Sequence, residues 1–111
     1  MNTKQQAEKG AKALLAKMKT KGWKSRVWEN LGWHYSIFNE HLEIYPVTCD
    51  GGEYHAMLAT CKSPAGGTPA FWHEGSTFKD PNAAATAAVK RARQFVNHVQ
   101  EVVATMERIL G

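Results

Sequence analysis

Apolar residues recur with helical spacing near both ends of the chain and with alternating spacing in between. In residues 4–21 they fall every three or four positions, which places them on one face of a helix. They are Ala7, Ala11, Leu14, Leu15 and Met18. Thr3 and Gln6 have the spacing of a capping box, and Gly22 is the residue type that often follows a last helical turn. The pattern predicts a first helix from Lys4 to Lys21.

Short runs rich in β-branched and aromatic residues, separated by turn residues, follow the first helix and predict strands. The expected strands are Lys24–Glu29, Trp33–Phe38, Leu42–Thr48 and Glu53–Thr60, with Ala70–His73 as a short edge strand. A two-residue turn at Asn39-Glu40 pairs Tyr35 with Ile44, and a turn at residues 49–52 pairs Ile44 with Met57. Alternation along these strands then collects one apolar core face. That face holds Trp33, Tyr35, Ile37, Leu42, Ile44, Met57 and Ala59.

A long second helix is predicted from Asp80 as the N-cap and Pro81 at the first helical position, continuing to Leu110. Its apolar residues alternate in steps of four and three, which is heptad spacing. Such a helix is about 45 Å long, whereas six-residue strands reach only about 20 Å, so its apolar stripe outruns the sheet. Either the first helix and the loop cover the remainder within one monomer, or a second chain does, giving a homodimer. The large residues expected at that interface are Val99, Val102, Val103, Met106, Ile109 and Leu110.

These elements predict one α+β domain over residues 1–111. It has an N-terminal helix, a three- to four-stranded antiparallel meander, and a long C-terminal helix packed on one face of the sheet. Apolar content of 43% and charged content of 22% fit a globular protein without a membrane span. The lysine-rich start lacks the apolar core of a signal peptide, so a cytoplasmic location is expected. In this register Cys49 and Cys61 lie about 24 Å apart, which predicts two free thiols.

Positive charge is concentrated at the start of the chain. The net charge is +4, and residues 1–26 contain eight of the 14 Lys and Arg residues with Glu8 as the single acid. Such a segment attracts nucleic acid or an acidic protein face, although lysines on a small helix can equally serve solubility alone. The candidate basic patch comprises Lys12, Lys19, Lys21, Lys24, Arg26, Arg91 and Arg93.

Aromatic residues are enriched on the sheet face opposite the predicted core. Aromatic side chains on a sheet stack nucleic-acid bases or anchor a protein partner. The candidate partner-binding residues are Phe38, Tyr45 and Tyr54, with His34 and His41 beside them. The alternative is that a further layer of the core covers them.

The motifs of common enzymes are incomplete or missing. His73-Glu74 begins the HExxH pattern of zinc proteases, but Thr77 stands where the second His is required. Gly66-Gly67-Thr68 lacks the lysine of a phosphate-binding loop, and there is no GxSxG motif. We therefore expect no catalytic residues, metal or cofactor, and a role in binding.

Two resemblances narrow that role. The order helix, antiparallel strands, Ala-rich helix with Lys90, Arg91 and Arg93 is similar to double-stranded RNA-binding domains, although the lysine cluster at the start of their second helix is absent here. The segments Trp28–Tyr35, Tyr45-Pro46, Gly52–Leu58 and Asp80–Ala84 resemble small phage- and prophage-encoded proteins of the anti-CRISPR type, over residues 23–96.

Membership of that second family would imply a non-enzymatic inhibitor in the bacterial host cytoplasm. Its partner would be a bacterial defence protein or ribonucleoprotein complex (CRISPR-Cas). Many such inhibitors are acidic mimics of DNA, whereas this chain is basic. It would therefore bind an acidic protein face, or guide or target nucleic acid. The alternatives are a nucleic-acid-binding module and an assembly protein that oligomerises through its long helix.

Overall fold

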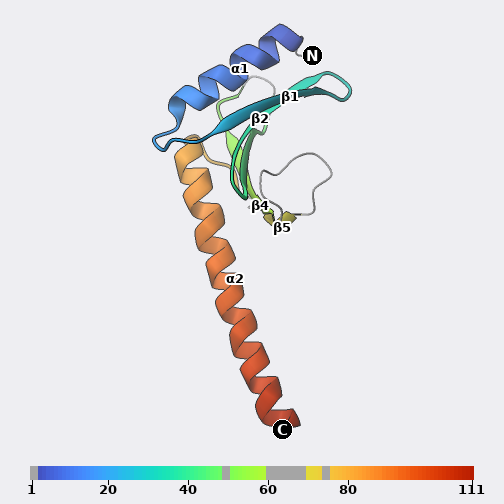
Figure 1. The fold of residues 1–111 in the computed structure, drawn as a ribbon, viewed down its shortest axis with the longest axis vertical. Helices are drawn as coiled ribbons and strands as arrows, with labels where there is room; N and C mark the ends of the chain where they lie inside the picture. Colours follow the sequence, from blue (N-terminus) through green and yellow to red (C-terminus); the bar gives the residue numbers. More distant parts are fainter. Residues whose placement is uncertain (1–2, 49–50, 60–69, 74–75) are drawn as a thin grey trace.

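The computed structural model describes residues 3–48, 51–59, 70–73 and 76–111 (Figure 1). In chain order it contains α1 (Lys4–Lys17), β1 (Lys24–Glu29), β2 (Trp33–Asn39), β3 (Leu42–Pro46), β4 (Tyr54–Ala59), β5 (Ala70–His73) and α2 (Pro81–Leu110). The strands form one antiparallel sheet in the order β1-β2-β3-β4-β5. The predicted α+β class and the helix–meander–helix order are confirmed, and β5 adds a fifth strand at one edge. Cys49 and Cys61 lie outside the described residues.

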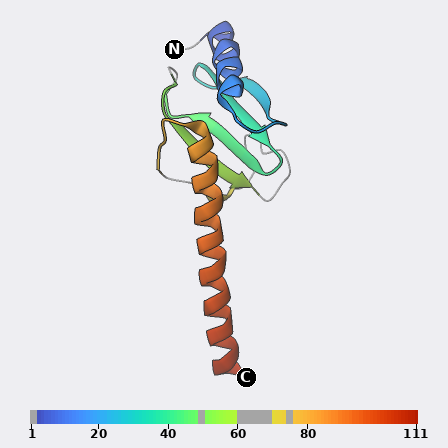
Figure 2. The same ribbon diagram turned by 90° about the vertical axis from the view of Figure 1, so that its left-hand side faces the viewer.

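Both helices pack on the same face of the sheet. α1 covers β1 and β2, while the first half of α2 covers β3 and β4 (Figures 1 and 2). The core between these layers consists of Ala7, Ala11, Leu14, Tyr35, Ile37, Ile44, Tyr54, Ala56, Ala84 and Ala88. Apart from Pro81, the buried residues of α2 are all alanines, and these small side chains let the helix approach the sheet closely.

The first helix ends four residues earlier than its sequence pattern predicts. Its capping box, formed by Thr3 and Gln6, is present as expected, but the helix stops at Lys17. The reason is a tertiary contact. The Asn82 side chain, at the start of α2, donates to the carbonyl oxygen of Lys17 (3.0 Å) and accepts from the backbone N–H of Lys19 (2.9 Å). Asn82 thereby satisfies backbone groups at the end of α1 and joins the two helices.

The strand register differs from the prediction at both hairpins. β2 and β3 turn at Glu40-His41, so Ile37 rather than Tyr35 pairs with Ile44. That shift is two residues and leaves every side chain on its predicted face. β3 and β4 pair Ile44 with Ala56 instead of Met57, a shift of one residue. A one-residue shift reverses the faces of a strand. Tyr54 and Ala56 therefore enter the core, and Met57 lies on the opposite face.

α2 is much longer than the sheet on which its first half packs. Asp80 caps it and Pro81 begins it, as predicted. The molecule measures 60 × 26 × 23 Å, and Figure 2 shows the second half of α2 leaving the body, with its C-terminal end at the far tip. In the described part of the chain, no helix is sufficiently long and apolar to cross a membrane.

Candidate interaction surfaces

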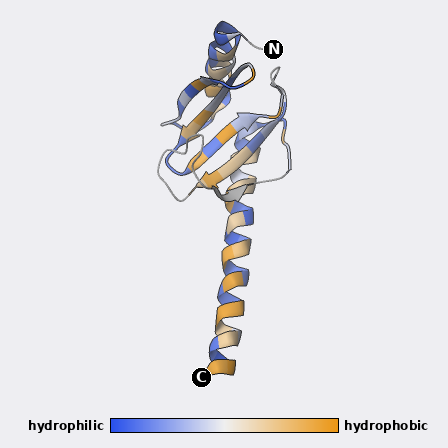
Figure 3. Ribbon diagram, turned by 90° about the vertical axis from the view of Figure 1, so that its right-hand side faces the viewer, coloured by the Kyte–Doolittle hydropathy of each residue, from blue (hydrophilic) through white to orange (hydrophobic). Residues whose placement is uncertain are grey.

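The projecting half of α2 presents an apolar stripe to solvent. From Arg93 onward every residue of the helix except Val96 is exposed, and hydrophobic residues recur along this part in Figure 3. The exposed fraction of the large side chains ranges from 40% at Val99 to 80% at Leu110. The stripe comprises Phe95 and the six predicted residues Val99, Val102, Val103, Met106, Ile109 and Leu110. The alternative that the first helix covers this stripe is wrong, because α1 packs on β1 and β2.

The predicted basic patch is divided among several faces of the molecule. Lys12 is exposed on α1, and Lys21 lies in the connection to β1. Lys24 pairs with Phe38 and lies on the sheet face away from the helices. Arg91 and Arg93 are two positions apart on α2, about 200° around the helix axis, so their side chains diverge. No single surface therefore carries all seven predicted residues.

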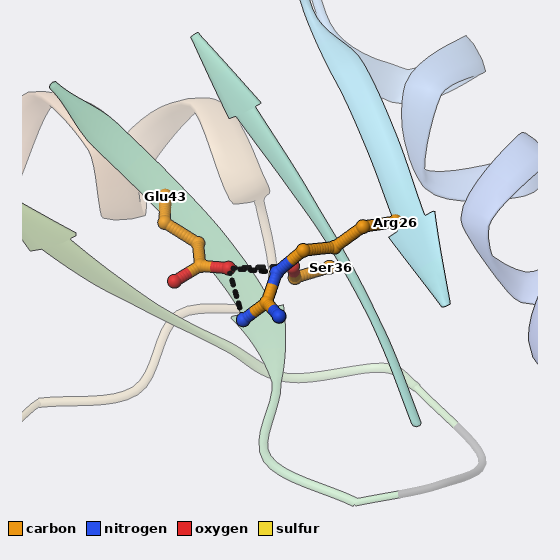
Figure 4. A network of polar contacts seen from close by, with 3 residues as sticks. All are labelled: Arg26, Ser36 and Glu43. Atoms are coloured by element: carbon orange, nitrogen blue, oxygen red, sulfur yellow. Dashed lines mark hydrogen bonds and ion pairs between the residues drawn. The ribbon is translucent and has the colours of Figure 1, made fainter. Parts of the chain in front are cut away.

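Arg26 takes part in a buried polar network instead of the patch. Its Nε donates to Oε2 of Glu43 at 3.0 Å, and its terminal nitrogen lies 3.0 Å from the same oxygen. The Ser36 hydroxyl also donates to that oxygen, at 2.6 Å (Figure 4). Ser36 is fully buried and Glu43 is 3% exposed, so the guanidinium neutralises a carboxylate that has little contact with water. The network joins β1, β2 and β3 on the face opposite the helices.

Two of the predicted basic residues, Lys19 and Arg93, line the same groove. The groove has a volume of about 830 Å³ and runs between the end of α1, the turn joining β2 and β3, and the first half of α2. Lys90, which was not among the predicted residues, is the third cation on its lining. The sequence feature that could have identified Lys90 is its spacing from Arg93, because residues three apart share a helix face.

The predicted aromatic site is partly dispersed. His34 and Tyr45 line a small cavity of about 190 Å³, together with Trp28 and Trp33. The His34 ring stacks on Trp28 at 5.7 Å and donates from Nε2 to the carbonyl of Asn30 at 2.7 Å.

The other predicted aromatic-site residues lie elsewhere. Phe38 on β2 is the cross-strand partner of Glu43 on β3, and both side chains lie on the sheet face away from the helices. His41 donates from Nδ1 to the carbonyl of Ala59 at 3.0 Å, at the hairpin end.

Tyr54 does not belong to the aromatic surface. Its side chain is 2% exposed within the core, and its hydroxyl accepts a 2.8 Å hydrogen bond from Nζ of Lys17 on α1. The prediction placed it outside because the β3–β4 pairing was displaced by one residue. The structure therefore makes Tyr54 part of the contact between α1 and the sheet.

Among the described residues, no group of three His, Cys, Asp or Glu side chains is placed to hold a metal ion. No protein-family model, curated protein or solved structure matches the chain.

Proposed function

We propose that this chain is a non-catalytic binding protein whose working form is a homodimer joined through the projecting half of α2. The observation that carries the proposal is the exposed stripe from Phe95 to Leu110. It extends for about 24 Å along the helix. Contiguous apolar surface of this kind is uncommon on monomers and is characteristic of interaction sites.

The chemistry of the stripe favours a second copy of the chain. Its residues repeat with heptad spacing, and Val96, Val103 and Leu110 widen it with a seven-residue row. The polar side of the same helix carries Glu101, Glu107 and Arg108, which keeps that side in water. Two copies that pack stripe against stripe form an isologous dimer interface, in which both apolar stripes are buried and neither is left exposed.

We propose more narrowly that the macromolecular partner is a bacterial defence complex, which this chain would inhibit. That proposal rests on the resemblance to phage accessory proteins over residues 23–96. A nucleic-acid-binding module has weaker support, because the predicted basic residues lie on different faces and Arg26 is paired with Glu43. A dimer that displays two copies of each surface suits a protein that binds a large assembly.

The test is the mass of the protein in solution. Light scattering coupled to size-exclusion chromatography should give twice the 12.3 kDa chain mass for the wild type. The double change Val102→Lys and Met106→Lys places two charges in the stripe and should give a folded monomer, with an unchanged near-ultraviolet circular dichroism spectrum. A wild-type protein that stays monomeric over about a hundredfold range of concentration refutes the proposal.

A matched control isolates the stripe from the added charge. Asn97 and Ala104 lie seven residues apart on the side of α2 opposite the stripe, and both are exposed. Asn97→Lys with Ala104→Lys adds the same number of lysines to the same helix and should leave the dimer intact. If this control also dissociates the protein, net charge rather than the stripe governs association.

A further inference from the structure

The groove between the two helices has walls that are held in place by side-chain hydrogen bonds. Asn82 bridges α2 to the last turn of α1 and to Lys19. Asn39, at the end of β2, donates to the carbonyl of Lys21 at 3.2 Å. The Trp23 indole N–H donates to the Thr20 hydroxyl at 2.8 Å, which fixes the ring at the side of the groove. These bonds join three separate chain segments, so the groove is formed before any partner arrives.

Its lining combines apolar side chains with positive charge. The apolar side chains come from the connection between α1 and β1, from β3 and from α2. They are Met18, Trp23, Leu42, Ala85 and Val89. Cations come from Lys19, Lys90 and Arg93, and the described residues of the lining include no Asp or Glu. Asp80 is nearby, but its carboxylate accepts hydrogen bonds from the Asn82 backbone and side chain.

We propose that this groove docks an acidic, amphipathic peptide segment of another protein. Large apolar side chains of the segment would pack against the apolar lining residues, and its carboxylates would lie beside Lys19, Lys90 and Arg93. A nucleic-acid strand fits less well, because phosphates need a continuous track of cations. Here the lining has three cations and five apolar side chains, and a phosphate backbone makes no favourable contact with the apolar side chains.

This inference does not depend on dimerisation. Val89 lies in the groove and is half exposed, whereas the stripe used for self-association begins at Phe95. The monomeric variant with Val102→Lys and Met106→Lys therefore keeps the groove, and it should bind a peptide with the affinity of the wild type. Loss of the dimer and loss of peptide binding are thus separate results.

The ligand class can be found without knowing the natural partner. Random peptides of about 12 residues, a common helix length, are displayed on phage and selected on the intact protein. Enriched sequences should carry Asp or Glu beside two or more large apolar residues spaced by three or four. A synthetic enriched peptide should shift the indole N–H signal of Trp23 in NMR spectra, assigned with Trp23→Phe.

Charge reversal then locates the site. Lys90→Glu with Arg93→Glu should weaken the synthetic peptide's binding at least about tenfold, measured by fluorescence anisotropy. Lys9→Glu with Lys12→Glu makes the same charge change on the exposed side of α1 and should leave affinity within about twofold.

Several results would overturn the proposal. They are enrichment of no peptides or of basic ones, equal weakening by both double variants, and a change of oligomeric state in Lys90→Glu with Arg93→Glu. Preferential binding of a nucleic-acid oligomer through Lys90 and Arg93 would assign the groove to nucleic acid instead.

Discussion

Gly10 of α1 lies directly against the ring of Tyr35 on β2. A Cβ atom placed on Gly10 would approach ring atom Cε1 to 2.5 Å and Cζ to 2.7 Å, well inside ordinary contact. Tyr35 is itself buried in the core beneath α1, so its ring has little room to move. The absence of a side chain at residue 10 therefore sets how closely the first helix approaches the sheet.

Gly10→Ala should destabilise the protein, opposite to the usual effect of this change in a helix. Helix propensity alone would stabilise it by about 1 kcal/mol, whereas the clash with Tyr35 should cost about 1–3 kcal/mol through displacement of packed atoms. Urea unfolding measures the net change. Ala13→Gly, at an exposed position of the same helix, is the control and should show the propensity cost alone. A stabilised Gly10→Ala variant would show that α1 lies farther from the sheet.

The Arg26–Glu43 pair should respond unequally to loss of either partner. Arg26→Met leaves the buried Glu43 carboxylate with the hydrogen bond from the Ser36 hydroxyl but without its cation, which should cost about 3–5 kcal/mol in the free energy of unfolding. Glu43→Leu should cost less, because the Arg26 side chain is 24% exposed and can reach water. The double variant should recover much of the loss.

Lys24→Met is the control for that pair, since Lys24 is an exposed cation on the same strand and the same face. It should change the free energy of unfolding by no more than about 0.5 kcal/mol. Equal losses for Lys24→Met and Arg26→Met would mean that the strand tolerates no apolar replacement, and that the ion pair is not the cause.

Acid should weaken the N-terminal cap of α2. The pKa of the Asp80 carboxyl is lowered, first by the hydrogen bond from the Asn82 side chain and next by the Asn82 backbone N–H. Because the folded pKa lies below the unfolded one, its stabilisation is complete above the ordinary aspartate pKa and is lost as pH falls through the lowered value. Asp80→Asn keeps a neutral cap. The stability advantage of the wild type over this variant should therefore shrink toward low pH in urea titrations, and a constant advantage would contradict the assignment.

Tyr54 and Tyr45 should behave differently although both are strand tyrosines. Tyr54→Ala empties a core position and should cost about 3–5 kcal/mol. Tyr45 is only partly buried, on the opposite face, so Tyr45→Ala should cost clearly less. Tyr54→Phe isolates the hydroxyl that accepts from Lys17 and should cost about 1 kcal/mol. Similar losses for the two alanine variants would contradict the observed register of β4.

The sequence by itself determined the helices, their starts and the class of fold. The signals at Thr3 and Gln6, and at Asp80 and Pro81, act within a few residues, so no distant contact is needed to interpret them. The apolar stripe of α2 is equally local, since helical geometry alone aligns residues three and four apart. Its excess length over the sheet also follows from the rise per residue.

Tertiary structure alone decided the features that depend on distant partners. The end of α1 depends on Asn82, 65 positions beyond Lys17. The side of the sheet occupied by Tyr54 depends on one residue of register between β3 and β4, which hydrophobic alternation does not resolve when both faces of a strand carry large side chains. Lys19 lines the same groove as Lys90 and Arg93 only after both helices have packed on the sheet. Spacing along the chain could not predict this arrangement, because it results from tertiary packing.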